Sequence, residues 1–171
     1  MFKFNNKVVV TLIVGLYFFW CLLFPYQWRL LDGVNVLIHE AGHPLFGILG
    51  EFMSILGGTL MQLIMPALFV GYFFWNNQKF SSAIVLFWVG HNLLNISIYS
   101  ADAVVMQLPL IGNGDRLHDW NYMLSELNLL GQTNKIALMI RISAIMTIIV
   151  AFVLSLIFSQ SDEEIVPTNL D

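Results

Sequence analysis

Five long apolar segments, separated by short polar stretches, predict the fold of this chain. They cover residues 8–24, 34–50, 55–75, 81–108 and 136–158. A helix needs about 20 predominantly apolar residues to cross a bilayer. We therefore expect an all-α, polytopic integral membrane protein with about five transmembrane or re-entrant helices.

The second apolar segment, residues 34–50, is near the lower length limit for a spanning helix. It contains Pro44, which has no N–H to donate to the carbonyl of Glu40, so the helix should loosen there. Backbone groups freed at membrane depth are tolerated only where protein or water covers them. The segment is therefore expected to be short or re-entrant and to face a polar cavity.

A shorter pattern follows the fourth segment. Apolar residues at 120, 123, 124, 127 and 130 have helical spacing and predict a short interfacial helix over 120–130. Asp119 is the expected N-cap of this helix, and Gly131 is its expected end. We expect residues 1–160 to form one membrane-embedded domain and the polar, acidic tail, 161–171, to be disordered.

Composition and charge support the membrane assignment. The chain is 58% hydrophobic and 11% charged, whereas soluble domains are about 25% charged. No basic block indicates nucleic-acid binding, and a single cysteine, Cys21, excludes an intramolecular disulfide or a cysteine-based metal site. If all five segments cross, the Lys and Arg positions favour a cytoplasmic N-terminus and a C-terminus outside; a re-entrant second segment would change this.

The candidate chemistry lies in the second segment, at His39-Glu40-Ala41-Gly42-His43. Residues four apart lie on one face of a helix, so both imidazoles can point at one metal ion. Glu40 lies about 100° round the helix and can reach a water on that ion without binding it. The motif predicts a zinc site with His39 and His43 as ligands and Glu40 as the general base and acid.

A catalytic zinc site needs a third protein ligand and an open position for water. Asn92, Asn95, Tyr99 and Asp102 form a polar stripe on the fourth segment, with spacings of three, four and three. An ionised carboxylate in a membrane helix is costly and indicates a functional partner. We expect Asp102 to be the third ligand and Asn95 to bind the substrate backbone or the oxyanion. His118 and Asp119 are the alternative ligands.

Some of these residues have structural alternatives. Asp102 can pair with Arg141 on the last segment, and Asn95 can hydrogen-bond a neighbouring helix. His118 and Asp119 can cap their loop. Structural or packing roles are expected for His91, Gln62, Gly57 and Gly58.

The two motifs together resemble the site-2 protease family of intramembrane zinc metalloproteases. That family pairs His-Glu-x-x-His on one transmembrane helix with Asn…Leu-Asp-Gly on a later one, whose Asp is the third ligand. His39, Glu40 and His43 match the first motif strictly. Asn95 and Asp102 match the second loosely, because alanine flanks Asp102 on both sides and no proline follows Asn95.

Residues 38–130 are also similar to small bacterial membrane proteins placed near that family. The similar motifs are Gly-Gly-Thr-Leu-x-Gln-Leu-x-x-Pro at 57–66, Tyr-x-x-Asp-Ala at 99–103 and His-Asp-Trp-Asn-Tyr at 118–122. The resemblance implies a zinc metalloendopeptidase, multi-pass in the bacterial cytoplasmic membrane, that hydrolyses membrane or juxtamembrane segments of protein substrates. The alternatives are an ion- or proton-conducting or scaffold membrane protein that uses the His/Asp/Asn cluster, and an inactive protease-like regulator.

Overall fold

The computed structural model describes residues 5–108 and 118–160, and every regular element in these ranges is helical. The expected tail at 161–171 and most of the loop before Asp119 lie outside the described residues. The elements are α1 (Asn6–Leu23), α2 (Leu30–Gly47), α3 (Glu51–Trp75), α4 (Lys79–Ala101), α5 (Asp119–Glu126), a 3₁₀ turn η1 (Leu130–Gln132) and α6 (Thr133–Ser159).

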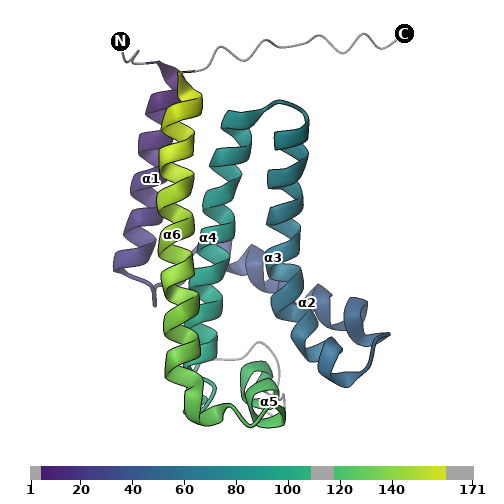
Figure 1. Cartoon of the computed structure of the whole chain (residues 1–171). Coiled ribbons are helices and arrows are strands. Elements are labelled where there is room, and N and C mark those ends of the chain that lie inside the picture. Colours follow the sequence, from purple (N-terminus) through teal and green to yellow (C-terminus); the bar gives the residue numbers. More distant parts are fainter. Residues whose placement is uncertain (1–4, 109–117, 161–171) are drawn as a thin grey trace, which may run out of the picture.

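Four of the described helical stretches are long and apolar enough to cross a membrane: α1, α3, α4 and the run Leu130–Ser159 that contains α6. In Figure 1 these helices run roughly along one direction, whereas α2 crosses behind the lower part of α3. The expectation of an all-α membrane protein is confirmed. The second apolar segment is not among the four candidate spans.

The two ends of the described chain lie together at one end of the bundle (Figure 1). The side-chain amide of Asn5 donates a hydrogen bond to the carbonyl of Ser159 across 2.8 Å. An even number of crossings returns the chain to its starting side. Opposite sides were expected only if all five segments cross, and α2 is not among the four candidate spans. The side of the membrane that the termini face stays a prediction.

The core lies between α1, α4 and α6. The rings of Phe18 and Phe87 stack with centroids 5.4 Å apart, and buried alanines such as Ala144 line the facing side of α6. A Cβ on Gly90 of α4 would lie 2.6 Å from Ile148. Within lipid, small residues of this kind allow the close backbone approach that holds helices together.

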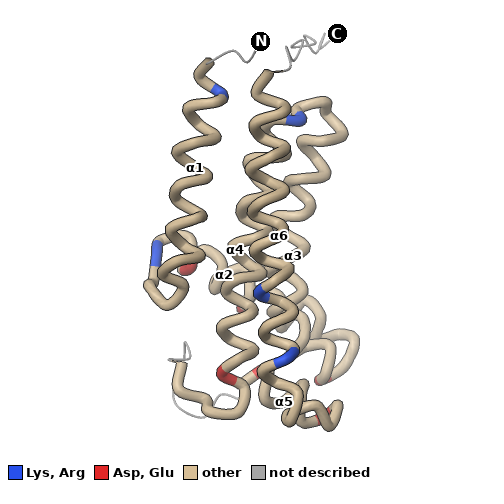
Figure 2. The backbone as a smooth tube through the Cα atoms, turned by 60° about the vertical axis from the view of Figure 1, so that its left-hand side comes forward, with Lys and Arg blue, Asp and Glu red and all other residues tan. Residues whose placement is uncertain are grey.

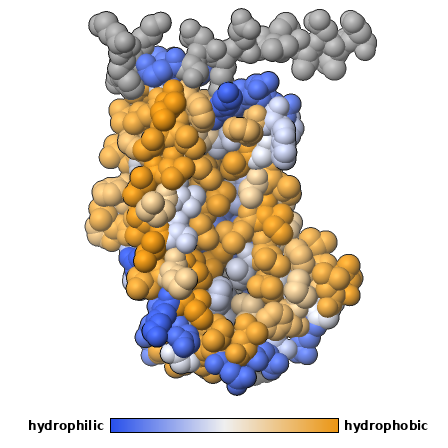
Figure 3. Space-filling view, in the orientation of Figure 1, coloured by the Kyte–Doolittle hydropathy of each residue, from blue (hydrophilic) through white to orange (hydrophobic). Residues whose placement is uncertain are grey.

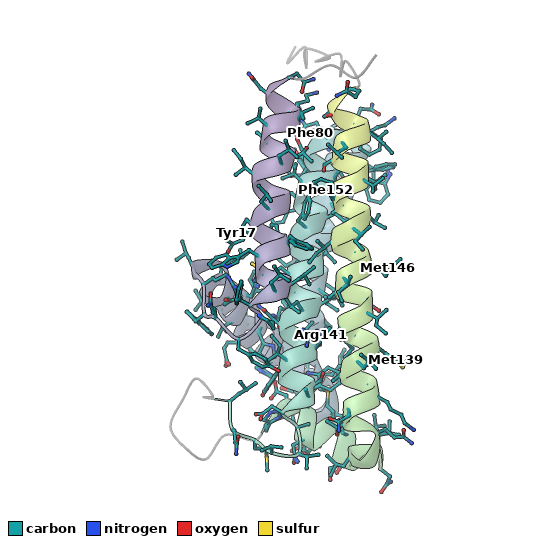
Figure 4. All side chains as sticks on the ribbon, turned by 90° about the vertical axis from the view of Figure 1, so that its left-hand side faces the viewer. Tyr17, Phe80, Met139, Arg141, Met146 and Phe152 are labelled. Atoms are coloured by element: carbon teal, nitrogen blue, oxygen red, sulfur yellow. The ribbon has the colours of Figure 1, made fainter. Side chains whose placement is uncertain are left out.

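Side chains of α6 divide between this core and the outside of the bundle. Phe152 points toward α1 and fills the space over Gly15, where an added Cβ would lie 2.7 Å from the Phe152 ring. Met139 and Met146 point outward and are exposed (Figure 4). The outward face of α6 is therefore apolar, as expected for contact with lipid.

Both helices of the α2–α3 hairpin begin four residues before the expected segments, whereas α3 ends at Trp75 as expected. α2 starts at Leu30 because the backbone N–H of Arg29 donates to the Asp32 carboxylate at 2.7 Å, which closes a capping box. α3 starts at Glu51, directly after Gly50, whose φ of +105° suits glycine. The two helices cross closely, since a Cβ on Gly42 would overlap the carbonyl of Gly57.

α4 ends at Ala101, seven residues before the expected end. The reason is Asp102, whose carboxylate accepts the backbone N–H groups of Gln107 and Leu108 at 2.9 Å each and so stabilises a turn. The interfacial helix is likewise shorter than expected, and its N-cap is His118 rather than Asp119, because the His118 ring accepts the backbone N–H of Asn121.

Candidate metal centre

Three potential ligands from two helices meet at the foot of α4. His39 and His43 come from α2, and Asp119 is the first residue of α5. Their ligand atoms all lie within 4.8 Å of one another. Asp119 Oδ2 is 2.8 Å from His39 Nε2 and 3.5 Å from His43 Nε2. Tetrahedral zinc bonds of 2.0–2.1 Å separate neighbouring ligand atoms by roughly 3.3 Å, so this spacing fits a metal ion.

Each ring has an acceptor beside its Nδ1 atom. His39 Nδ1 lies 3.3 Å from the Gln62 side-chain oxygen, and His43 Nδ1 lies 2.9 Å from the Ser54 carbonyl oxygen. These acceptors suit the tautomer that carries its proton on Nδ1. In that tautomer the lone pair of each Nε2 points toward Asp119. Contacts of this kind orient metal-binding histidines in proteins generally.

With the protons on Nδ1, two Nε2 lone pairs and one carboxylate meet at a place where His39 is 9% exposed and Asp119 is 8% exposed. In the other tautomer of His39, Nε2–H donates a hydrogen bond to Asp119 Oδ2 across the same 2.8 Å. Buried acceptors that face one another repel unless a cation or extra protons lie between them. The described cluster therefore has the chemistry of a cation site, and nothing in its geometry selects which cation.

Asp119 reaches the cluster because the end of α4 holds the start of α5. The Tyr99 hydroxyl accepts the backbone N–H of Asp119 at 3.1 Å. The Asn121 amide donates to the carbonyl of Ala103 at 2.7 Å. The Tyr99 ring also packs against the His118 ring, with centroids 4.4 Å apart. Tyr99 of the polar stripe and the carbonyl of Ala103 therefore position the helix that carries a candidate ligand.

Neither Asp102 nor His118 faces the two histidines of α2. Asp102 caps the turn after α4, and its Oδ2 lies 3.4 Å from His118 Nε2. His118 Nδ1 is occupied by the N–H of Asn121. Burial lowers the pKa of the His118 imidazole, and the nearby Asp102 carboxylate opposes this shift. The structure therefore places Asp102 on the turn after α4, outside the cluster. Asp119, one of the two alternative ligands, lies in the cluster instead, and its role as the third ligand stays a prediction.

Asn95 lies against α2 and lines the same cavity as the cluster. Its amide donates to Asp32 Oδ1 at 2.9 Å, and His91 Nε2 lies 2.8 Å from the same oxygen. His91 therefore contacts Asp32, in keeping with the structural role expected for it. The expected contact of Asn95 with a substrate stays a prediction. The sequence did not lead us to expect a role for Asp32 in this cavity. The available signal was its spacing, because a residue seven positions before His39 lies on the same helix face.

The cluster opens into a cavity of about 760 Å³, within the size range of ligand pockets. Glu40 lines it beside His39 and His43. The remaining walls come from the segment between α1 and α2, from α3 and α4, and from Leu108. Glu40 therefore borders the same space as the candidate ligands, as its helical offset from His39 predicts.

Gly58 of α3 makes room for the ring of His39. An added Cβ would lie 2.6 Å from His39 Nε2. We expect Gly58→Ala to displace the ring and lower the affinity for a divalent cation, with zinc as the probe, by at least about tenfold. Gly131→Ala is the matched control, because a Cβ there meets nothing within 4 Å. Equal zinc affinity in both variants would show that His39 does not face a bound ion.

The contact between Gln62 and His39 gives a second prediction. Gln62→Leu removes the acceptor of His39 Nδ1, and losses of such outer contacts lower metal affinity by about 10–100-fold. Gln62→Glu keeps an acceptor in place and should retain most of the affinity. Titration of both detergent-solubilised variants with zinc measures the difference. Unchanged affinity in Gln62→Leu would mean that this contact does not orient a ligand.

No protein-family model, no curated protein and no solved structure matches this chain. Its likeness to the site-2 proteases is therefore a likeness of motifs. The described structure defines a helical membrane protein with a candidate metal-binding group on two of its helices.

Proposed function

We propose that this protein is a membrane-embedded zinc metalloprotease. The observation that carries the proposal is the pair of imidazoles whose Nδ1 atoms are hydrogen-bonded and whose Nε2 atoms face Asp119. A glutamate directly follows the first histidine and lines the adjoining cavity. Two histidines, a carboxylate ligand and a neighbouring glutamate are the parts that zinc peptidases use.

Zinc is a metal that fits this donor set, and the neighbouring Glu40 is the reason for proposing zinc over other metals that bind imidazole. Catalytic zinc sites commonly have two histidines and one carboxylate, with a fourth position open to water. Magnesium and calcium prefer sites made entirely of oxygen. The only cysteine of the chain, Cys21, is buried in the core on α1, so a thiolate ligand plays no part in the proposed site.

Peptide hydrolysis assigns a separate role to each group. When bound, zinc acidifies the water in its open position and polarises the scissile carbonyl. Glu40 takes the proton of that water and returns it to the leaving amine. Asn95, already oriented by Asp32, binds the backbone of the substrate from the opposite wall of the cavity.

The substrate in this proposal is a membrane or juxtamembrane segment of another protein, and the location is the bacterial cytoplasmic membrane. A scissile bond within a helix has its backbone groups occupied, so the segment must be extended before cleavage. The cavity is lined by apolar side chains, such as Val36 and Ile98, and by polar ones, such as Gln62 and Asn95, which suits an extended segment with apolar side chains and a polar backbone.

Removal and return of the metal test the proposal. We expect the purified full-length chain in detergent to cleave a fluorophore-labelled membrane-anchored reporter peptide, to lose cleavage with 1,10-phenanthroline and to regain it with zinc. Bound zinc is measured in the same samples. Cleavage that persists in the metal-free chain, or no cleavage of a reporter panel at full zinc occupancy, would refute the protease assignment. The second result would favour the inactive regulator.

A further inference from the structure

The outward face of α2 is apolar over the whole length of the helix. Its residues recur with helical spacing and are all exposed: Leu30, Val34, Leu37, Ala41, Leu45 and Ile48. Leu37 is 73% exposed and Ile48 is 87% exposed. The opposite face buries polar groups, among them Asp32, Asn35 and His39. α2 is therefore amphipathic with the opposite orientation to a surface helix of a soluble protein, because its polar face is toward the protein.

The lengths of neighbouring helices give the depth at which α2 begins. The 18 residues of α1 rise about 27 Å. The uncharged part of α6, residues 142–159, also rises about 27 Å. α1 begins and α6 ends at the same end of the bundle, where Asn5 contacts Ser159. One hydrocarbon thickness, roughly 30 Å, therefore separates that end from the start of α2.

Polar and aromatic side chains mark this second level. Tyr26 and Trp28 follow α1 and are exposed; such aromatics concentrate at membrane interfaces. Arg29 comes next, and Arg141 lies at the lower end of the uncharged part of α6 (Figure 4). Figure 2 shows no charged residue along the upper part of the spanning helices below the charges at their upper end; lower down, charged residues occur at several levels, including part-way along α6. The chain therefore enters α2 at a membrane surface.

We propose that α2 lies in the plane of one membrane leaflet, with its outward face against lipid acyl chains. Figure 1 shows α2 running across the bundle, and Figure 3 shows that the apolar surface of the spanning helices continues onto the region where α2 and the start of α3 lie. The exposed stripe is continuous with the lipid-facing surface, so the same apolar solvent covers both. This placement brings His39 and His43 close to one membrane surface.

Spin labels on single cysteines measure this immersion directly, and the measurement does not depend on the proposed protease function. The full-length chain carries Cys21→Ala, which removes the only native thiol, together with Leu37→Cys or Leu45→Cys. It is reconstituted in vesicles of phosphatidylcholine and phosphatidylglycerol. Val153→Cys on α6 is the lipid-facing control, and Glu126→Cys on α5 is the water-facing control; both positions are exposed.

The readout is the ratio of collision rates with oxygen, which partitions into lipid, and with a water-soluble nickel chelate. We expect ratios at 37 and 45 that match Val153→Cys and exceed Glu126→Cys several-fold. Ratios equal to that of Glu126→Cys would overturn the proposal. Low accessibility to both reagents, with spin–spin broadening that disappears on dilution with unlabelled protein, would also overturn it, because a second copy would then cover α2.

Discussion

Replacing Asp119 by asparagine lowers the zinc affinity of the full-length chain by more than about 100-fold, whereas the same replacement at Asp102 lowers it by no more than about tenfold. The reason is position. Asp119 Oδ2 lies within 3.5 Å of both Nε2 atoms, while Asp102 acts through the turn after α4 and through His118. Competition titration against a zinc chelator measures both affinities.

The two variants form a matched pair, since each exchanges one buried or half-buried aspartate for an isosteric amide. A larger loss in Asp102→Asn than in Asp119→Asn would restore Asp102 as the third ligand. Equal and small losses would mean that the two histidines hold the ion without either carboxylate. His91→Gln serves as a control for the histidines, because His91 contacts Asp32 rather than the cluster.

Replacing Glu40 by glutamine abolishes most of the cleavage and leaves the zinc in place. General acid–base catalysis contributes about 10²–10⁴-fold to a rate, so the cleavage rate of the reporter peptide should fall by that factor. Bound zinc, measured on the same preparation, should remain at the wild-type level. Glu40 borders the cavity but is not one of the three clustered ligands.

Glu126→Gln is the matched control for this prediction, since Glu126 is exposed at the end of α5 and should affect neither property. Loss of zinc in Glu40→Gln would make Glu40 a ligand rather than a base. Full cleavage in Glu40→Gln would assign the proton transfer to another group.

The parts of the site that depend on local geometry could be predicted from the sequence. His39 and His43 are four residues apart, and one turn of helix brings their rings together whatever the rest of the chain does, with ring centroids 5.0 Å apart. Glu40 follows from the same helix. The apolar runs likewise predicted the four spanning helices, because length and hydropathy decide that question.

The third ligand could not be predicted in the same way, because it depends on where α4 ends. The polar stripe of α4 predicted a carboxylate that projects from a continuous helix. Asp102 instead ends the helix by accepting backbone N–H groups of the following turn. This shifts the candidate ligand to Asp119, which reaches the cluster only through tertiary contacts with Tyr99 and the end of α4.

The direction in which α2 runs could not be predicted by counting apolar residues either. Asp32, Asn35 and His39 give the helix one polar face, and that face contacts Gln62 on α3 and Trp88 and His91 on α4. These contacts leave the opposite, apolar face of α2 exposed, and that face is the basis of the proposal that α2 lies in the plane of one leaflet.

X-ray absorption at the zinc edge of the metal-loaded full-length chain tests the central claim most directly. The proposed site predicts a four-coordinate shell of nitrogen and oxygen at about 2.0–2.2 Å, with scattering from two imidazoles and no sulfur. Asp119→Asn should alter the oxygen part of that shell, and Asp102→Asn should not. A sulfur shell at about 2.3 Å, a six-oxygen shell or the absence of imidazole scattering would contradict a site built from His39, His43 and Asp119.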